Sequence, residues 1–301
     1  MTASTVTAPG TIEPLRSWPG GRYEDDWVVV EPGGPGGITA GPRPDGRIAI
    51  RHRLRPSELD DELAGPLAEA LAPLTVEHEV FARAFTGVVL TARPHAATAW
   101  ELFYRNSLAR IRHATRPGYA AVYRHALQLL PATSVADVGC GFGFLSLHLA
   151  SRGAAVSAWD CEPGTTALVR HMASRLGARL DVRTADGASL PLPAGSADAV
   201  VLLHVLEHVP AGHGTALLAE AIRVARRRVV VAVPFEDHPT ALFGHVRSFT
   251  LAGLATLGAA TGLPYRCYDH HGGWLILDRP SRGRPPGLPF PKEENRHARP
   301  R

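Results

Sequence analysis

The sequence has little of three features that mark common classes of protein: cysteine, lysine and long apolar runs. The three cysteines, at positions 140, 161 and 267, are too few and too scattered to indicate a disulfide framework or a cysteine-based zinc site. No apolar run is long enough to span a bilayer, and the N-terminus lacks a charged stretch followed by an apolar one. We therefore expect a reduced, cytoplasmic, soluble protein that does not use a membrane.

The basic charge of the chain is confined to its C-terminal end. The 301 residues have a formal net charge of +4, and one of the 32 basic residues is a lysine. Residues 279–301 contain seven Lys or Arg and two Glu, a net charge of +5, so residues 1–278 sum to about −1. The main body gives no electrostatic reason to expect a nucleic-acid partner. The Pro/Arg-rich segment 279–301 and the Thr/Pro/Gly-rich segment 1–22 are predicted to be disordered.

The central motif of the sequence is a strand pattern that ends in alternating glycines. Residues 134–138 are followed by Gly139, Gly141 and Gly143, and an apolar helical pattern starts at Phe144. Glycine lets the backbone turn sharply and lets a ligand approach without meeting a Cβ atom. This order of strand, glycine-rich turn and helix is typical of the ligand-binding edge of an open α/β sheet.

Strand and helix patterns alternate after this motif. Strands are predicted at about 135–139, 155–160, 180–185, 198–204 and 229–234, and helices at 143–152, 164–176 and 213–226. Such alternation with short connections predicts a parallel sheet covered on both faces. After a further helix at 250–261, strands at 265–269 and 274–278 are joined by a tight turn and predict an antiparallel pair at one edge.

Carboxylates follow the predicted strands at the edge where the glycine turn lies. Asp160 ends the second strand, 17 residues after Gly143, where a carboxylate can accept both hydroxyls of a ribose. Asp186, followed by Gly187, ends the third strand and could accept an adenine amino group. An NAD-dependent dehydrogenase would explain the glycines and Asp160, but not the final antiparallel pair.

Together these features resemble class I S-adenosylmethionine-dependent methyltransferases over residues 117–278. The resemblance rests on Asp137–Gly143, Asp160, Asp186–Gly187, Leu206-Glu-His-Val209 and the final antiparallel strand. It implies a Rossmann-like α/β fold, a mostly parallel seven-stranded sheet whose last strand is antiparallel, and S-adenosylmethionine as cofactor. It also implies roles in which Gly139, Gly141 and Gly143 face the amino-acid part of the cofactor, Asp137 supports that part, Asp160 holds the ribose, and Asp186 with Gly187 holds the adenine.

A narrower resemblance involves other segments of the chain. Gly244–Thr250, His270–Trp274 and Trp100–Arg105 make the sequence similar to mycofactocin oligosaccharide methyltransferases. Members of that family O-methylate a glucose unit in the oligosaccharide of a peptide-derived redox cofactor, which implies a sugar hydroxyl on a glycan-bearing small molecule as acceptor. Methylation of another small metabolite at O, N or C, and a non-catalytic protein that binds S-adenosylmethionine, stay open as alternatives. The oligomeric state stays open as well.

A hydroxyl acceptor requires a general base, and histidine suits that role near neutral pH. His204, at the end of the fourth strand, and His245, in the loop after the fifth, are the predicted catalytic residues. The run Glu236-Asp237-His238 could in principle bind a cation, but adjacent residues rarely converge on one ion. We therefore expect an ordinary polar loop there and no metal site.

The residues before the main domain are predicted to form an accessory, substrate-side α+β region over 24–115. It contains strand patterns near residues 26–31 and 47–53, separated by a Gly/Pro-dense stretch. The pattern favours a hairpin with a long loop.

Overall fold

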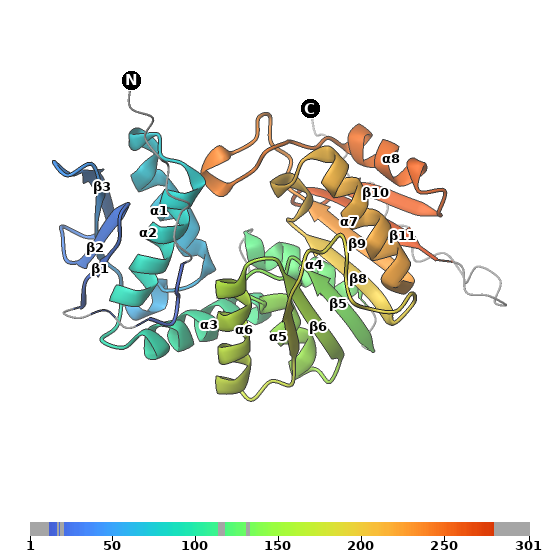
Figure 1. The fold of residues 1–301 in the computed structure, drawn as a ribbon, viewed down its shortest axis with the longest axis horizontal. Coiled ribbons are helices and arrows are strands. Elements are labelled where there is room, and N and C mark those ends of the chain that lie inside the picture. The colour runs from blue at the N-terminus through green and yellow to red at the C-terminus, as the bar shows by residue number, and fades with distance from the viewer. Residues whose placement is uncertain (1–11, 17, 19–20, 114–117, 131–132, 280–301) are drawn as a thin grey trace, which may run out of the picture.

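The computed structural model describes residues 12–16, 18, 21–113, 118–130 and 133–279. The segments predicted to be disordered, 1–22 and 279–301, lie largely outside these residues. The described chain has two parts, a small α+β region and a larger sheet with helices on both faces (Figure 1).

The larger part is a seven-stranded sheet with the order β10-β11-β9-β8-β5-β6-β7. The five strands β5 to β9 are parallel, and β11 runs antiparallel to both β9 and β10. This confirms the expected Rossmann-like fold with an antiparallel last strand. The strands are β5 Ser134–Val138, β6 Ala155–Asp160, β7 Asp181–Thr184, β8 Ala197–Leu203, β9 Ala225–Val233, β10 Tyr265–Asp269 and β11 Gly273–Asp278.

Both faces of this sheet are covered because its strands are apolar on both sides. Helices α4 and α5 pack on one face, and α7 and α8 pack on the other. The central strand β8 is buried from Ala197 to Leu202. The helices are α4 Tyr119–Leu129, α5 Phe144–Ser151, α6 Pro163–Arg175, α7 Ala211–Val224 and α8 Leu251–Ala260.

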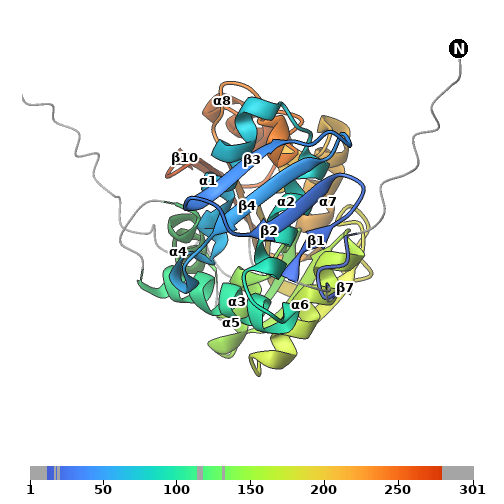
Figure 2. The same ribbon diagram turned by 90° about the vertical axis from the view of Figure 1, so that its left-hand side faces the viewer.

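The accessory region contains a four-stranded sheet with the order β1-β2-β4-β3. Figure 2 shows this sheet with helix α2 behind it. The helix packs closely, because a Cβ atom at Gly87 would lie 2.5 Å from a Val30 methyl group and 2.7 Å from the Tyr23 ring. The elements are β1 Tyr23–Glu24, β2 Val28–Pro32, β3 Gly37–Pro42, β4 Ile48–Arg53, α1 Ala64–Leu71, α2 His78–Thr91 and α3 Ala96–His113.

The predicted hairpin in the accessory region is wrong. Strands β2 and β4 are parallel, and the stretch read as a loop contains β3, which pairs antiparallel with β4. Ile38 and Ala40 of β3 are half-buried, while its Gly and Pro residues lie on an edge strand. An edge strand tolerates these residues because one side of its backbone has no strand partner. Their abundance therefore concealed the strand.

Aromatic side chains join the accessory region to the larger sheet. Trp100, Phe103 and Tyr104 of α3 are buried, and their rings contact Phe142 of the glycine turn and Phe144 at the start of α5. These residues belong to one continuous hydrophobic cluster. The accessory region is therefore fixed against the part of the sheet that carries the glycine motif.

Part of the N-terminal segment also packs on this cluster. The Nε1–H of buried Trp100 donates a hydrogen bond of 2.6 Å to the carbonyl oxygen of Pro14. Leu15 and Trp18 pack against the same cluster. The prediction of disorder over 1–22 therefore does not hold for residues 12–16 and 18, because a buried donor and apolar contacts hold them.

We expect Trp100→Phe to lower the free energy of unfolding by about 1 kcal/mol, the usual net contribution of one hydrogen bond. Phenylalanine also fills less of the buried space of the indole, so this value is the minimum loss, and it includes the contact with Pro14. Urea unfolding followed by fluorescence measures it, and Trp27→Phe at an exposed position is the matched control. A stability equal to that of the control variant would mean that the hydrogen bond contributes nothing.

Candidate active site

The three glycines of the turn differ in what their missing side chains allow. All have positive φ, at 71° for Gly139, 51° for Gly141 and 70° for Gly143. A Cβ atom at Gly139 would lie 2.5 Å from Val205, and one at Gly143 would lie 2.6 Å from Val169. At Gly141 nothing lies within 4 Å of that position. Gly139 and Gly143 therefore permit close packing, whereas Gly141 leaves the backbone open towards a ligand.

Asp160 holds this turn in place from the end of β6. One carboxylate oxygen accepts the backbone N–H of Gly141 at 3.0 Å, and the other accepts that of Glu162 at 3.0 Å. A carboxylate has about four lone-pair sites, so two backbone hydrogen bonds leave capacity for the hydroxyls of a ribose. Asp160 can thus fix the turn and bind a nucleoside at once.

Asp137 lies behind the turn and does not line the cavity described below. It is buried in β5, and its carboxylate accepts the Ser146 hydroxyl of α5 at 2.6 Å. Burial raises the pKa of Asp137 to about 6, although the Ser146 hydrogen bond opposes the shift. The side chain therefore connects strand to helix at the base of the site.

Asp186 and Gly187 follow β7, which ends at Thr184, and neither lines the cavity described below. The Asp186 carboxylate accepts the backbone N–H of Ala188 at 2.9 Å and lies 3.1 Å from His213 Nε2. A Cβ atom at Gly187 would meet Val138 and Leu217 at 2.5 and 2.7 Å, so this glycine allows close packing. The exposed Asp186 carboxylate is free to meet a ligand from the solvent side.

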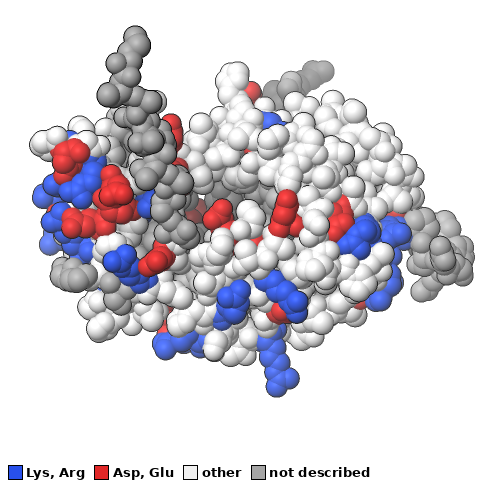
Figure 3. Space-filling model, viewed as in Figure 1, with Lys and Arg blue, Asp and Glu red and all other residues white. Residues whose placement is uncertain are grey.

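A cavity of about 670 Å³ opens where the accessory region meets the carboxyl ends of the strands. Figure 3 shows the surface hollowed between these two parts. Of the predicted site residues, Gly141, His204 and His245 line the cavity, while the other two glycines of the turn and the three aspartates do not. An adjoining hollow of about 350 Å³ shares six lining residues with it and extends to His271.

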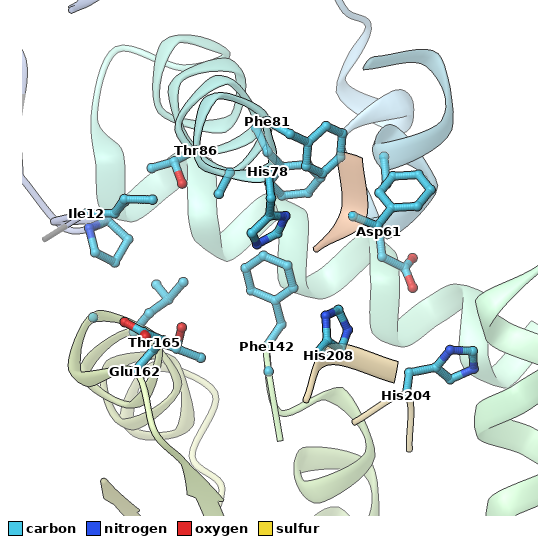
Figure 4. Close-up of a pocket in the computed structure, with 18 of the residues that line it drawn as sticks. Ile12, Asp61, His78, Phe81, Thr86, Phe142, Glu162, Thr165, His204 and His208 are labelled. Carbon is cyan, nitrogen blue, oxygen red and sulfur yellow. The ribbon is translucent and has the colours of Figure 1, made fainter. Parts of the chain in front are cut away.

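His204 lies at the end of β8 in a left-handed conformation, with φ at 54°. That conformation is uncommon for residues other than glycine, and its occurrence at a cavity is a sign of functional constraint. Its ring contacts Tyr119 edge-on, with 5.7 Å between centroids, and its Nδ1 lies 3.1 Å from a Glu207 carboxylate oxygen. His204 therefore lines the cavity at the end of β8 (Figure 4).

His245 is held by a carboxylate from the loop after β9. Its Nδ1 lies 2.8 Å from Oε2 of Glu236, and the other oxygen, Oε1, accepts a hydrogen bond from the Thr240 hydroxyl. Burial raises the pKa of Glu236, but the hydrogen bonds from His245 and Thr240 outweigh it, and the pKa lies below its usual value. In the tautomer that carries its proton on Nδ1, His245 donates to Glu236 and keeps a lone pair on Nε2.

The accessory region contributes side chains to the cavity that the sequence pattern did not single out. They include Asp61, His78, Phe81 and Phe85 from residues 61–91. Tyr119, at the start of α4 and outside the accessory region, lines the cavity too. Figure 4 shows His78 and Phe81 across the cavity from Phe142. The only sequence signal was the acidic run of residues 60–62.

Asp61 lines both hollows, and its pKa is shifted further than that of the other carboxyl groups in their lining. Burial, followed by the charges of Asp60 and Glu62, raises the pKa of Asp61 to about 7. A raised carboxyl pKa means that the folded protein binds more protons than the unfolded chain between about pH 4 and pH 7. Ionised Asp61 therefore destabilises the fold, and its cost reaches its full size above pH 7.

Asp61→Asn should accordingly stabilise the protein at pH 8 and make little difference at pH 4. Three pKa units at about 1.4 kcal/mol each set an upper bound of about 4 kcal/mol for the gain. Thermal melts of both proteins at the two pH values measure it, with exposed Asp181→Asn as control. An equal gain at both pH values would rule out ionisation of Asp61 as the cause.

Comparison with known proteins gives a family match over the segment that contains the glycine turn. A family model described as a methyltransferase domain matches residues 135–228. A ubiquinone biosynthesis O-methyltransferase of Methylocella silvestris is 37% identical over 86 residues, which cover 29% of this chain and 34% of that protein. The chloroplastic magnesium protoporphyrin IX methyltransferase of Arabidopsis thaliana is 28% identical over 141 residues, 44% of this chain and 45% of that protein.

These relatives share only part of their length with this chain, which spans less than half of each. Among solved structures, the magnesium protoporphyrin IX methyltransferase of Synechocystis with bound SAM is similar with a TM-score of 0.42 and 22% identity, covering 57% of this chain and 77% of that one. Among the described residues, no helix has the length and apolar character needed to cross a membrane. The matched segment contains the glycine turn and strands β6 to β8, so residues 135–228 of this chain are similar to a methyltransferase domain.

Proposed function

We propose that the whole chain transfers a methyl group from S-adenosylmethionine to a hydroxyl of a small molecule. The observation that carries this proposal is that Gly141, His204 and His245 line one cavity at the carboxyl ends of the parallel strands. The open face of Gly141 and the spare lone pairs of Asp160 suit the amino-acid and ribose parts of the cofactor. Gly141, a predicted cofactor contact, and the two candidate bases therefore border the same cavity.

The residues of the site would act mainly by orientation and by proton transfer. When bound, S-adenosylmethionine supplies an electrophilic methyl group on sulfur. Walls that align the acceptor oxygen with that carbon convert a bimolecular encounter into an intramolecular one. As the oxygen–carbon bond forms and the carbon–sulfur bond breaks, the hydroxyl proton passes to an imidazole nitrogen, for which His204 is our first candidate and His245 the second.

The lining of the cavity supports a sugar-bearing acceptor. Phe81, Phe85 and Phe142 provide apolar rings, and Asp61 and His78 provide polar groups beside them. Rings can pack against the apolar faces of a sugar while the polar groups meet its hydroxyls. The adjoining hollow gives room for a further sugar unit. We propose the mycofactocin oligosaccharide as substrate, with the accessory region 24–115 as the substrate side.

The curated relatives favour a second candidate. Several of them are O-methyltransferases of ubiquinone biosynthesis, which points to oxygen as the acceptor atom and to an aromatic hydroxyl as an alternative to a sugar. The aromatic lining of the cavity would suit such a ring too. The cytoplasmic location predicted from the cysteine pattern stays a prediction.

Methyl transfer from labelled S-adenosylmethionine to a panel of acceptors separates the two candidates. The panel should contain glucosylated peptide-derived acceptors, the same acceptors without sugar, and simple phenols. Transfer that requires the sugar is the expected result. Transfer to phenols alone would establish the second candidate, and failure with every hydroxyl acceptor would contradict the proposed reaction.

A further inference from the structure

Three side chains beside the cavity have the composition and spacing of a metal-binding set. Glu207 and His208 come from the turn after β8, and His245 comes from the loop after β9. One ligand-type atom from each of these three residues lies within 4.8 Å of the others. Ligand atoms of a tetrahedral site lie about 3.4 Å apart, since each is about 2.1 Å from the metal. Inward movements of about 1 Å or less per side chain would complete such a site.

Glu207 is the member of this set whose carboxylate is buried without a hydrogen-bond partner for either oxygen among the described residues. Its side chain is 0% exposed. His204 Nδ1 lies 3.1 Å from one oxygen without the alignment of a hydrogen bond. Arg247 acts on Glu207 electrostatically, but it donates its Nε–H to the carbonyl of Leu206 instead. A buried carboxylate in this state is costly unless a cation completes it.

The two histidines are oriented as metal ligands are. His245 Nδ1 lies 2.8 Å from the Glu236 carboxylate, and His208 Nδ1 lies 3.3 Å from the carbonyl oxygen of Gly244. Metal-binding histidines usually donate one ring N–H to a carboxylate or carbonyl, which fixes the tautomer and directs the other nitrogen to the metal. Both rings therefore have Nε2 available, and both line the cavity.

We propose that Glu207, His208 and His245 bind a divalent transition-metal ion such as Zn²⁺ at the wall of the cavity. Two imidazoles and one carboxylate suit such ions, and three protein ligands leave a position open for another oxygen. This site differs from the run 236–238, in which Glu236 supports His245 instead of binding the ion. If the proposed function holds, the open position faces the acceptor hydroxyl, and the ion lowers the pKa of that hydroxyl.

Direct titration of the chelator-treated full chain tests this site without reference to methyl transfer. Co²⁺ serves as the spectroscopic probe because its visible absorption bands report a low-symmetry site with nitrogen ligands, and calorimetry with Zn²⁺ gives the stoichiometry. We expect one equivalent to bind, His208→Ala and Glu207→Gln to weaken the affinity at least tenfold, and Glu236→Gln to weaken it about tenfold through His245. His208 is exposed, so its alanine variant leaves the core untouched.

His238→Ala is the matched control, because it removes a neighbouring exposed histidine. Wild-type affinity in this variant, with loss in His208→Ala and His245→Ala, supports the site. Absence of Co²⁺ and Zn²⁺ binding to the wild-type chain would overturn it, as would wild-type affinity in both His208→Ala and His245→Ala. Binding lost only in His238→Ala would place the ion in the run 236–238 instead. Methyl transfer that persists in the chelator-treated enzyme would show that the proposed function does not depend on a metal ion at this site.

Discussion

Replacement of His204 by alanine should lower the turnover of methyl transfer about 10²- to 10⁴-fold. This range is the usual contribution of a positioned general base, and the imidazole lies on the cavity wall with Nδ1 beside Glu207. Affinity for S-adenosylmethionine should stay nearly unchanged, because the turn of residues 139–143 and Asp160 are untouched. Steady-state kinetics with the accepted substrate, together with calorimetry of the cofactor, measure both quantities.

The left-handed backbone at His204 requires a second variant. Asparagine adopts φ near 54° more readily than alanine, so His204→Asn keeps the turn while it removes the base. Both variants should lose turnover alike. His245→Ala should also lose turnover, but with loss of the metal ion, whereas His204→Ala should keep that ion. If the His204 and His245 variants both keep full turnover, neither residue is the base.

Asp160→Ala should weaken the binding of S-adenosylmethionine by about 1.5–3 kcal/mol, which corresponds to roughly 10- to 150-fold in affinity. Hydrogen bonds to a charged group contribute in this range, and the change removes both the proposed ribose acceptor and the anchor for the Gly141 N–H. Calorimetric titration measures the effect.

The control for this variant is Asp181→Ala, which removes an exposed aspartate that pairs with Arg183. Thermal melts without ligand show whether Asp160→Ala disturbs the fold itself. Wild-type affinity for the cofactor in Asp160→Ala would remove this residue from the site.

The sheet was predictable because its central strands are buried on both faces and read as continuous apolar runs. Strand β9 shows the limit of that signal. It begins at Ala225, whereas the sequence predicted a start near 229, because three arginines precede the apolar run. Arg226 pairs with Asp198, and Arg228 pairs with Asp278 at 2.7 Å. These partners lie 28 and 50 residues away, so no local pattern could reveal them.

The candidate site also has a part that the sequence could predict and a part that it could not. The glycines and Asp160 lie within one strand-turn-helix-strand unit, so their spacing was informative. His245 was chosen for its loop, but its partner Glu236 and its approach to Glu207 depend on how two loops fold over the sheet edge. The wall built by Asp61, His78 and Phe81 depends on the docking of the accessory region. Contacts of this kind arise only in the folded chain.

Calorimetric titration of the purified chain with S-adenosylhomocysteine, compared with NAD, tests the central claim most directly. The open turn at Gly141 and the carboxylate of Asp160 predict tight binding of S-adenosylhomocysteine with one equivalent per chain, and no measurable heat from NAD. Tight binding of NAD with no binding of S-adenosylhomocysteine would contradict the assignment of this edge of the sheet to a methyl donor.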